Sequence, residues 1–200
     1  MNLHAIMIKF LVALVSFSAL AVPATAYSEY EIQGDLYTQH QVLWNAIKSV
    51  GVKAYLNPPG CKVLKKDGIS GMYFPGGKYG GRLVVCQNNY NPQEGKAKVN
   101  WTEDDLNTLR HEAHHLVQDC RVGGFGDGKG SILFDKEGLA NFILSSGLSK
   151  SRVETIVSEY KTMDYKNDEI LMELEAFAAA KAVPAHIIAK KVVEFCSSHK

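Results

Sequence analysis

Apolar residues recur at helical spacing between residues 35 and 50, and Gly51 ends this pattern, which predicts an amphipathic helix. Beyond it, short runs of strand-forming residues alternate with turns rich in Pro, Gly, Asn and Asp. These runs cover residues 52–56, 61–64, 71–74 and 82–87. They predict a small, mostly antiparallel sheet in the first half of the chain.

After residue 101 the pattern of apolar positions becomes helical. Thr102 is a favourable N-cap, and the acidic residues Glu103 to Asp105 follow it where the helix dipole favours negative charge. Pro184 is typical of the first turn of a helix. Helices are therefore expected at about 102–120, 136–146, 149–162 and 167–182, and from about 184 onward.

The order of helix, sheet and further helices predicts an α+β fold class. The length of the chain favours a single domain. We expect this domain to cover residues 27–200, with the first helix and the sheet in 27–101 and a helical part in 102–200.

The first 26 residues have the pattern of a cleaved export signal. Lys9 precedes an apolar run from Phe10 to Val22, and Ala24 and Ala26 fit the small-residue cleavage site. The apolar run is too short to span a membrane, which takes about 20 residues. We therefore expect a secreted or periplasmic protein that begins at Tyr27 and keeps no stable membrane anchor.

Four cysteines follow this segment, at positions 61, 86, 120 and 196. An even number in an exported chain predicts disulfides, and the absence of a Cys-x-x-Cys spacing disfavours a zinc–thiolate site. Spacing alone leaves the pairing open. We expect Cys61–Cys86 and Cys120–Cys196, because each of these pairs ties together one half of the chain.

Charge excludes one class of partner. Lys and Arg number 22 against 21 Asp and Glu, for a formal net charge of +1, without a basic stripe. Proteins that bind nucleic acid usually carry a basic excess, so we expect no nucleic-acid partner.

The segment 110–115 contains the pattern His-Glu-x-x-His. On a helix, His111 and His115 lie one turn apart on the same face, so both imidazoles can reach one metal ion. Glu112 lies to the side, where its carboxylate can take a proton from a metal-bound water. His114 could also chelate with His111, but that pairing leaves Glu112 without a role, so we expect His114 to support the site or to be exposed.

The same helix has an apolar face roughly opposite the two histidines. We expect that face to pack on the sheet. The alternative for the histidines is a solvated polar face without a metal. The apolar face consists of Leu106, Leu109, Ala113, Leu116, Val117 and Cys120.

A third ligand is expected in the segment 169–180, which is apolar on nearly all sides. Glu173 and Glu175 lie in this segment, and a buried carboxylate is costly unless it is paired or binds a metal. At least one of them is therefore expected to face a cation. The alternative is a pair of carboxylates at the rim of the protein.

Residues 111–115, followed by the Glu-x-x-Ala helix, resemble the zincin metallopeptidases of the gluzincin branch. In several of those families the third ligand is the first Glu of a Glu-x-x-Ala-Asp or Glu-x-x-Ala-Asn stretch. That Glu corresponds to Glu173, with Ala176 as the small residue. Phe177 stands where those families often have Asp or Asn, which keeps Glu175 as an alternative ligand.

The resemblance implies a zincin-like fold, in which a small sheet packs on the active-site helix. It also implies a strand along the cleft, for which we expect residues 82–87, with an exposed edge that an extended peptide can join. The glycine-rich loop 122–130 is expected to border the cleft. Candidates for the group that stabilises the oxyanion are Tyr160, Tyr165 and His186.

The expected function is therefore an exported, monomeric peptidase that cleaves a peptide or protein substrate with one zinc ion. His111, His115 and Glu173 are the expected ligands, and Glu112 is the expected general base. Two alternatives remain, namely a non-catalytic domain of the same shape with a structural metal, and a disulfide-stapled interaction module without metal. Glu112 favours the enzyme, because a structural zinc needs no base.

Overall fold

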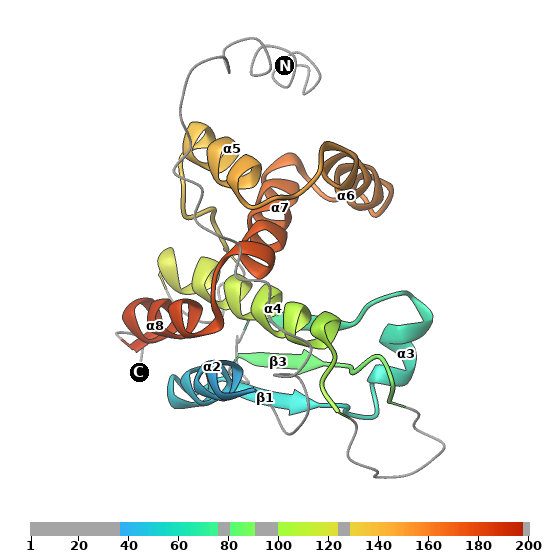
Figure 1. The fold of residues 1–200 in the computed structure, drawn as a ribbon, viewed down its shortest axis with the longest axis vertical. Helices are drawn as coiled ribbons and strands as arrows, with labels where there is room; N and C mark the ends of the chain where they lie inside the picture. The colour runs from blue at the N-terminus through green and yellow to red at the C-terminus, as the bar shows by residue number, and fades with distance from the viewer. Residues whose placement is uncertain (1–36, 76–80, 91–99, 124–128, 198–200) are drawn as a thin grey trace.

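The computed structural model describes residues 37–75, 81–90, 100–123 and 129–197 (Figure 1). They form an α+β fold that is mostly helical, in agreement with the coarse prediction from the sequence. The expected signal segment 1–26 lies outside the described residues. In chain order the elements are α2 (Thr38–Ser49), β1 (Lys53–Leu56), α3 (Cys61–Lys66), β2 (Gly71–Phe74), β3 (Arg82–Val85), α4 (Glu103–Arg121), α5 (Lys136–Ser145), α6 (Lys150–Thr162), α7 (Asn167–Ala182) and α8 (Ala185–Cys196).

The three strands form one sheet in the order β1-β3-β2. β2 pairs with β3 antiparallel, as expected, but β1 pairs with β3 in parallel. The sheet is therefore mixed, and the prediction of a mostly antiparallel sheet is wrong for β1. Parallel neighbours need a crossover connection between them, and α3 and β2 lie in that connection.

The composition of the segment 61–64 predicts a strand, and this prediction is wrong. The segment forms the first part of α3. The N–H of Cys61 donates to the carbonyl of Pro58 and opens the helix with a turn. Cys61 is the buried residue of this helix, and lysines cover its last turn. A run of four residues is too short for its periodicity to distinguish a helix from a strand, which explains the error.

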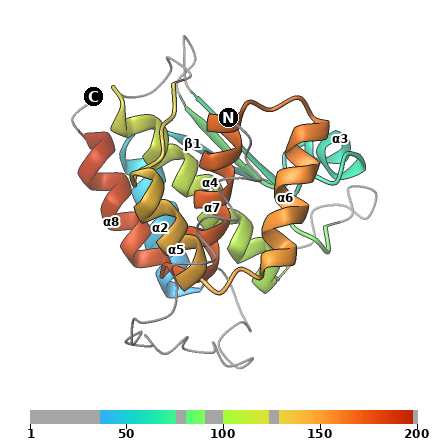
Figure 2. The same cartoon turned by 90° about the horizontal axis from the view of Figure 1, so that it is seen from above.

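Helix α4 is the central element of the fold and crosses the molecule between the sheet and α7 (Figure 1). On one side it contacts β2, β3 and α8, and on the other it contacts α7. Figure 1 shows α5 and α6 at the end of the molecule away from the sheet, and in Figure 2 they lie on either side of α7. The main core contains the apolar face that was expected to meet the sheet, namely Leu106, Leu109, Ala113, Leu116, Val117 and Cys120.

The start of α4 lies at the predicted N-cap Thr102, where the structure shows a capping box. The Thr102 hydroxyl accepts the N–H of Asp105 at 3.2 Å, and the Asp105 carboxylate accepts the N–H of Thr102 at 2.8 Å. The same carboxylate accepts the N–H of Asn88 at 2.8 Å. One buried aspartate therefore joins the beginning of α4 to the chain that follows β3.

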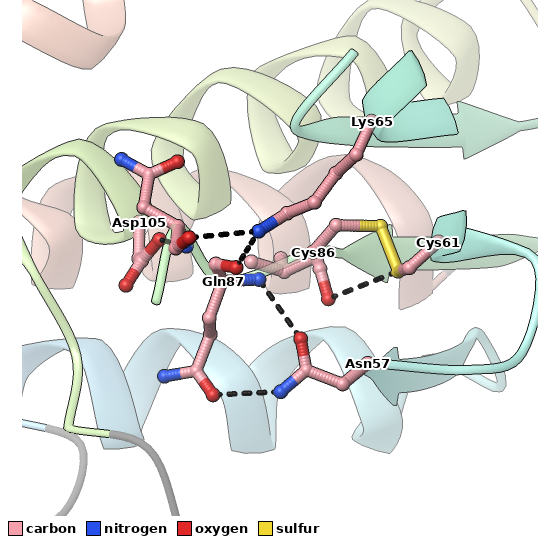
Figure 3. Close-up of a disulfide and its surroundings, with 8 residues drawn as sticks. Asn57, Cys61, Lys65, Cys86, Gln87 and Asp105 are labelled. Atoms are coloured by element: carbon pink, nitrogen blue, oxygen red, sulfur yellow. Dashed lines mark hydrogen bonds between the residues drawn. A yellow bond between two sulfur atoms is a disulfide. The ribbon is translucent and has the colours of Figure 1, made fainter. Parts of the chain in front are cut away.

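Two disulfides join Cys61 to Cys86 and Cys120 to Cys196, which confirms the expected pairing. The first lies beside Lys65, which donates to the carbonyl of Gln87 (Figure 3). The second joins the end of α4 to the end of α8. Disulfides of this kind are typical of proteins that fold in an oxidising, exported environment. Within the described ranges, no helix is both long and apolar enough to span a bilayer.

Candidate metal centre

Three side chains from α4 and α7 converge where the two helices pack together. His111 and His115 lie one turn apart on α4, and their Nε2 atoms are 3.0 Å apart. Glu173 Oε2, from α7, lies 3.2 Å from His111 Nε2 and 3.4 Å from His115 Nε2. The face of α4 opposite the sheet is therefore not a solvated polar face, because α7 covers it.

This arrangement fits a zinc ion. Tetrahedral ligands at about 2.0–2.1 Å from zinc lie about 3.3 Å from one another, which matches the separations of the three atoms. Two imidazole nitrogens and one carboxylate oxygen form a donor set that catalytic zinc uses. Glu173 Oε2 is buried without a hydrogen-bond donor, so the oxygen that faces the histidines is available to a cation.

The electrostatics of the three groups reflect their contacts. Burial alone would raise the pKa of Glu173, but its contacts with His111 and His115 hold that pKa well below its usual range. Burial alone would lower the pKa of His115, but the neighbouring Glu173 raises it to about 9. The side chains of His111, Glu173 and His115 are 11, 13 and 18% exposed. Most of their surface is therefore buried, but a small part of each side chain is in contact with solvent.

Glu112 lies on the side of α4 that faces β2. It is 7% exposed, and burial raises the pKa of its carboxyl group against the effect of His111 and His115. The nearby backbone of Tyr73, in β2, also acts to lower this pKa. A group with a raised pKa and an oriented carboxylate is suited to accept a proton and to return it.

The strand beside the site is β2, and the expectation that residues 82–87 line the cleft with an exposed edge is wrong. β3 is the central strand and pairs with β1 and β2 on its two sides. Among the described strands β2 is an outer one, and its Gly71 lies so close to α4 that a Cβ there would be 3.0 Å from Glu112 Oε1. Which strand lies beside the site depends on the order of the strands in the sheet, and no local pattern in the sequence indicates that order.

Glu175, the alternative ligand, faces away from the three converging atoms. It is completely buried and accepts hydrogen bonds from Gln118 Nε2 at 2.7 Å and from the N–H of Leu133 at 2.8 Å. His114 Nε2 lies 3.6 Å from the same carboxylate. His114 is buried, so of the two roles expected for it the exposed one is wrong. Burial lowers the pKa of His114.

Of the three candidates for oxyanion stabilisation, the two tyrosines lie near the site. Burial raises the pKa of Tyr160, and the negative charge of the nearby Glu173 raises it further. The rings of Tyr160 and Tyr165 are in edge contact, with centroids 4.9 Å apart. His186 instead hydrogen-bonds to Gln39 and does not belong to this group.

Two contacts around the histidines were not predicted from the sequence. The ring of Phe177 packs against the ring of His111, with centroids 4.4 Å apart. Gln118 Oε1 lies 2.8 Å from His115 Nδ1. Gln118 follows His115 by three positions on one helix, so the spacing alone could have identified it. Of the expected glycine-rich loop, residues 124–128 lie outside the described residues.

Comparisons with protein-family models, with curated protein sequences and with solved structures find no match to this chain. The interpretation of the site therefore depends on its own geometry and chemistry.

Proposed function

We propose that this chain is a zincin-like, zinc-dependent peptidase. His111, His115 and Glu173 hold one zinc ion, and Glu112 is the general base. The observation that carries this proposal is the convergence of His111 Nε2, His115 Nε2 and Glu173 Oε2 to within 4.8 Å of one another. A base beside the three ligands favours a catalytic over a structural role for the metal, because structural zinc sites use closed sets of four ligands.

The reaction is the hydrolysis of a peptide bond. When bound, zinc supplies Lewis-acid polarisation of a carbonyl group and lowers the pKa of a water molecule. Glu112 takes a proton from the attacking water while the oxygen of that water adds to the carbonyl carbon. The C–N bond then breaks, and the Glu112 carboxyl group gives its proton to the leaving amine nitrogen, so the carboxylate is regenerated. The Tyr160 hydroxyl is the proposed donor to the developing oxyanion.

A peptide substrate is supported by the outer edge of β2. The carbonyl of Ser70 accepts the N–H of Cys86. In the antiparallel register of β2 and β3, the backbone N–H and C=O groups of every second residue from Ser70 onward therefore point toward β3. Gly71 and Tyr73 consequently direct their backbone groups away from β3, on the side of β2 where Glu112 lies near the backbone of Tyr73. An extended peptide that pairs with the free backbone groups of Gly71 lies next to the base.

Three glutamate variants test the proposal. Glu112→Gln should keep its bound zinc and lose hydrolysis, because the amide cannot take up the proton. Glu173→Gln should lose both zinc and hydrolysis. Glu154→Gln is the matched control, because this half-exposed carboxylate on α6 pairs only loosely with Lys150, at 3.8 Å. It should retain both properties.

The measurements are the zinc content of the purified proteins and the cleavage of a quenched peptide library. Zinc binding by the unaltered protein without cleavage would favour the non-catalytic domain. Undiminished cleavage by Glu112→Gln would refute the proposed mechanism, whereas zinc retained by Glu173→Gln would refute only the choice of ligand.

We also propose that residues 1–26 are a cleaved export signal. Support comes from the apolar run from Phe10 to Val22, the small residues Ala24 and Ala26, and the two disulfides, which need an oxidising compartment.

A further inference from the structure

One metal-site histidine has a hydrogen-bond partner on its other ring nitrogen. His115 Nδ1 lies 2.8 Å from Gln118 Oε1. Because an amide oxygen only accepts hydrogen bonds, Nδ1 carries a proton, and Nε2, which faces His111 and Glu173, is the ring nitrogen left to bind a metal. His111 differs, since its Nδ1 is buried without a partner.

The orientation of the Gln118 amide is itself determined by its surroundings. Its Nε2 donates to Glu175 Oε2 at 2.7 Å and to the carbonyl of Met172 at 3.1 Å. Both partners are acceptors, so the amide nitrogen must face α7 and the amide oxygen must face His115. Gln118 is 1% exposed, so bulk solvent does not reach its side chain.

Glu175 anchors this arrangement. Its carboxylate is completely buried on α7 and accepts the N–H of Leu133 through both oxygens, at 2.8 and 3.0 Å. A buried carboxylate without donors would be unstable, so Leu133 and Gln118 together hold it in place. The hydrogen bonds therefore run from the segment before α5, through α7, to a histidine on α4.

We propose that Gln118, anchored by Glu175, is a positioning residue that fixes the tautomer and the direction of His115 and thereby raises the affinity of the site for zinc. This inference depends on the proposed function, because it takes His115 as a zinc ligand. Residues that orient metal-binding histidines in this way commonly change metal affinity by about 10–100-fold.

Three variants separate positioning from general stability. Gln118→Met keeps the length of the side chain and removes the acceptor. Gln118→Glu keeps an oxygen for the His115 N–H, and as a carboxylic acid it can also donate to Glu175. Gln87→Met is the matched control, because Gln87 is also 1% exposed and accepts a hydrogen bond from Asn57 at 2.8 Å, at the end of β3 (Figure 3).

The zinc dissociation constant of each folded protein is measured by competition with a chromophoric chelator. We expect Gln118→Met to bind zinc about 10–100-fold more weakly, and Gln118→Glu and Gln87→Met to bind it as the unaltered protein does. Loss of thermal stability in all three variants would not alter this expected order of zinc affinities among the folded proteins. Unchanged affinity in Gln118→Met, or affinity in Gln118→Glu as weak as in Gln118→Met, would overturn the inference.

A measurement on the unaltered, zinc-bound protein covers the case in which Gln118→Met does not fold. Nitrogen NMR of the His115 ring should place the proton on Nδ1, with slow exchange against solvent. A proton on Nε2, or fast exchange at Nδ1, would overturn the positioning role while leaving zinc binding intact. Failure of the unaltered protein to bind zinc would instead overturn the proposed function, and this inference with it.

Discussion

β2 lies close against α4 at Gly71, and substitution by alanine tests the proposed position of β2 beside the base. An added Cβ would lie 2.4 Å from Thr108 Cγ2 and 3.0 Å from both Cγ and Oε1 of Glu112. Carbon atoms in contact are normally about 3.5–4.0 Å apart, so in Gly71→Ala the strand and the helix must separate by about 1 Å.

The expected effects of Gly71→Ala follow from this displacement. Overpacking of this kind costs about 1–3 kcal/mol of the free energy of unfolding. Because Glu112 is one of the crowded groups, a shift of about 1 Å should also lower peptide cleavage, by about 100-fold. Zinc content should not change, because the three ligands lie on α4 and α7 and not on β2.

Urea unfolding and peptide cleavage are measured for Gly71→Ala, Thr108→Ser and the double variant. Thr108→Ser removes the crowding Cγ2 and keeps the hydroxyl that donates to the Asp104 carbonyl at 2.9 Å, so the double variant should regain much of the lost stability. Gly60→Ala is the control, because nothing lies within 4 Å of its added Cβ. Wild-type stability in Gly71→Ala, or no coupling with Thr108→Ser, would refute the close packing.

Three further outcomes are expected. Replacing both Cys120 and Cys196 by alanine opens a loop with a sequence separation of 76. This should lower the free energy of unfolding, measured in urea, by about 4.5 kcal/mol, because the unfolded chain gains conformational entropy. A loss below about 1 kcal/mol would contradict this reasoning. Burial and the nearby Arg110 lower the pKa of His40 to about 3, from 6.5, so below pH 6.5 the unfolded chain binds a proton that the native chain does not. The free energy of unfolding should therefore fall as the pH drops from 6.5 toward 3. In His40→Gln the change of the free energy of unfolding with pH should be smaller by about 1.4 kcal/mol per pH unit. An equal pH dependence in both proteins would count against the burial of a neutral imidazole. N-terminal sequencing of exported material should begin at Tyr27, and material that still begins at Met1 would contradict signal cleavage.

The features that the sequence predicts well are those encoded within a few neighbouring residues. Thr102 is identified as the N-cap of α4 from its residue type and the acidic residues after it, and its side chain accepts the N–H of Asp105 as expected. His111 and His115 lie on the same face of α4, because residues four positions apart are about one helical turn apart. The disulfide pairing succeeded for a different reason, because four cysteines in two halves of a chain leave few arrangements.

The features that the sequence predicts poorly depend on how distant segments pair. Residues 82–85 read as a strand and are one, but their composition does not reveal that β3 has neighbours on both sides. The parallel pairing of β1 likewise depends on the path of the chain between residues 57 and 81.

The choice between Glu173 and Glu175 shows the same limit within one helix. Two positions apart, their side chains leave α7 in nearly opposite directions, and the helix is apolar on most sides, so periodicity does not distinguish them. Packing distinguishes them, because Glu173 meets the two imidazoles and Glu175 meets Gln118. Under the proposed function both carboxylates serve one metal centre, one as a ligand and the other through an amide that orients His115. The apolar helix tolerates the fully buried Glu175 and the largely buried Glu173, because each carboxylate meets partners that compensate for its burial.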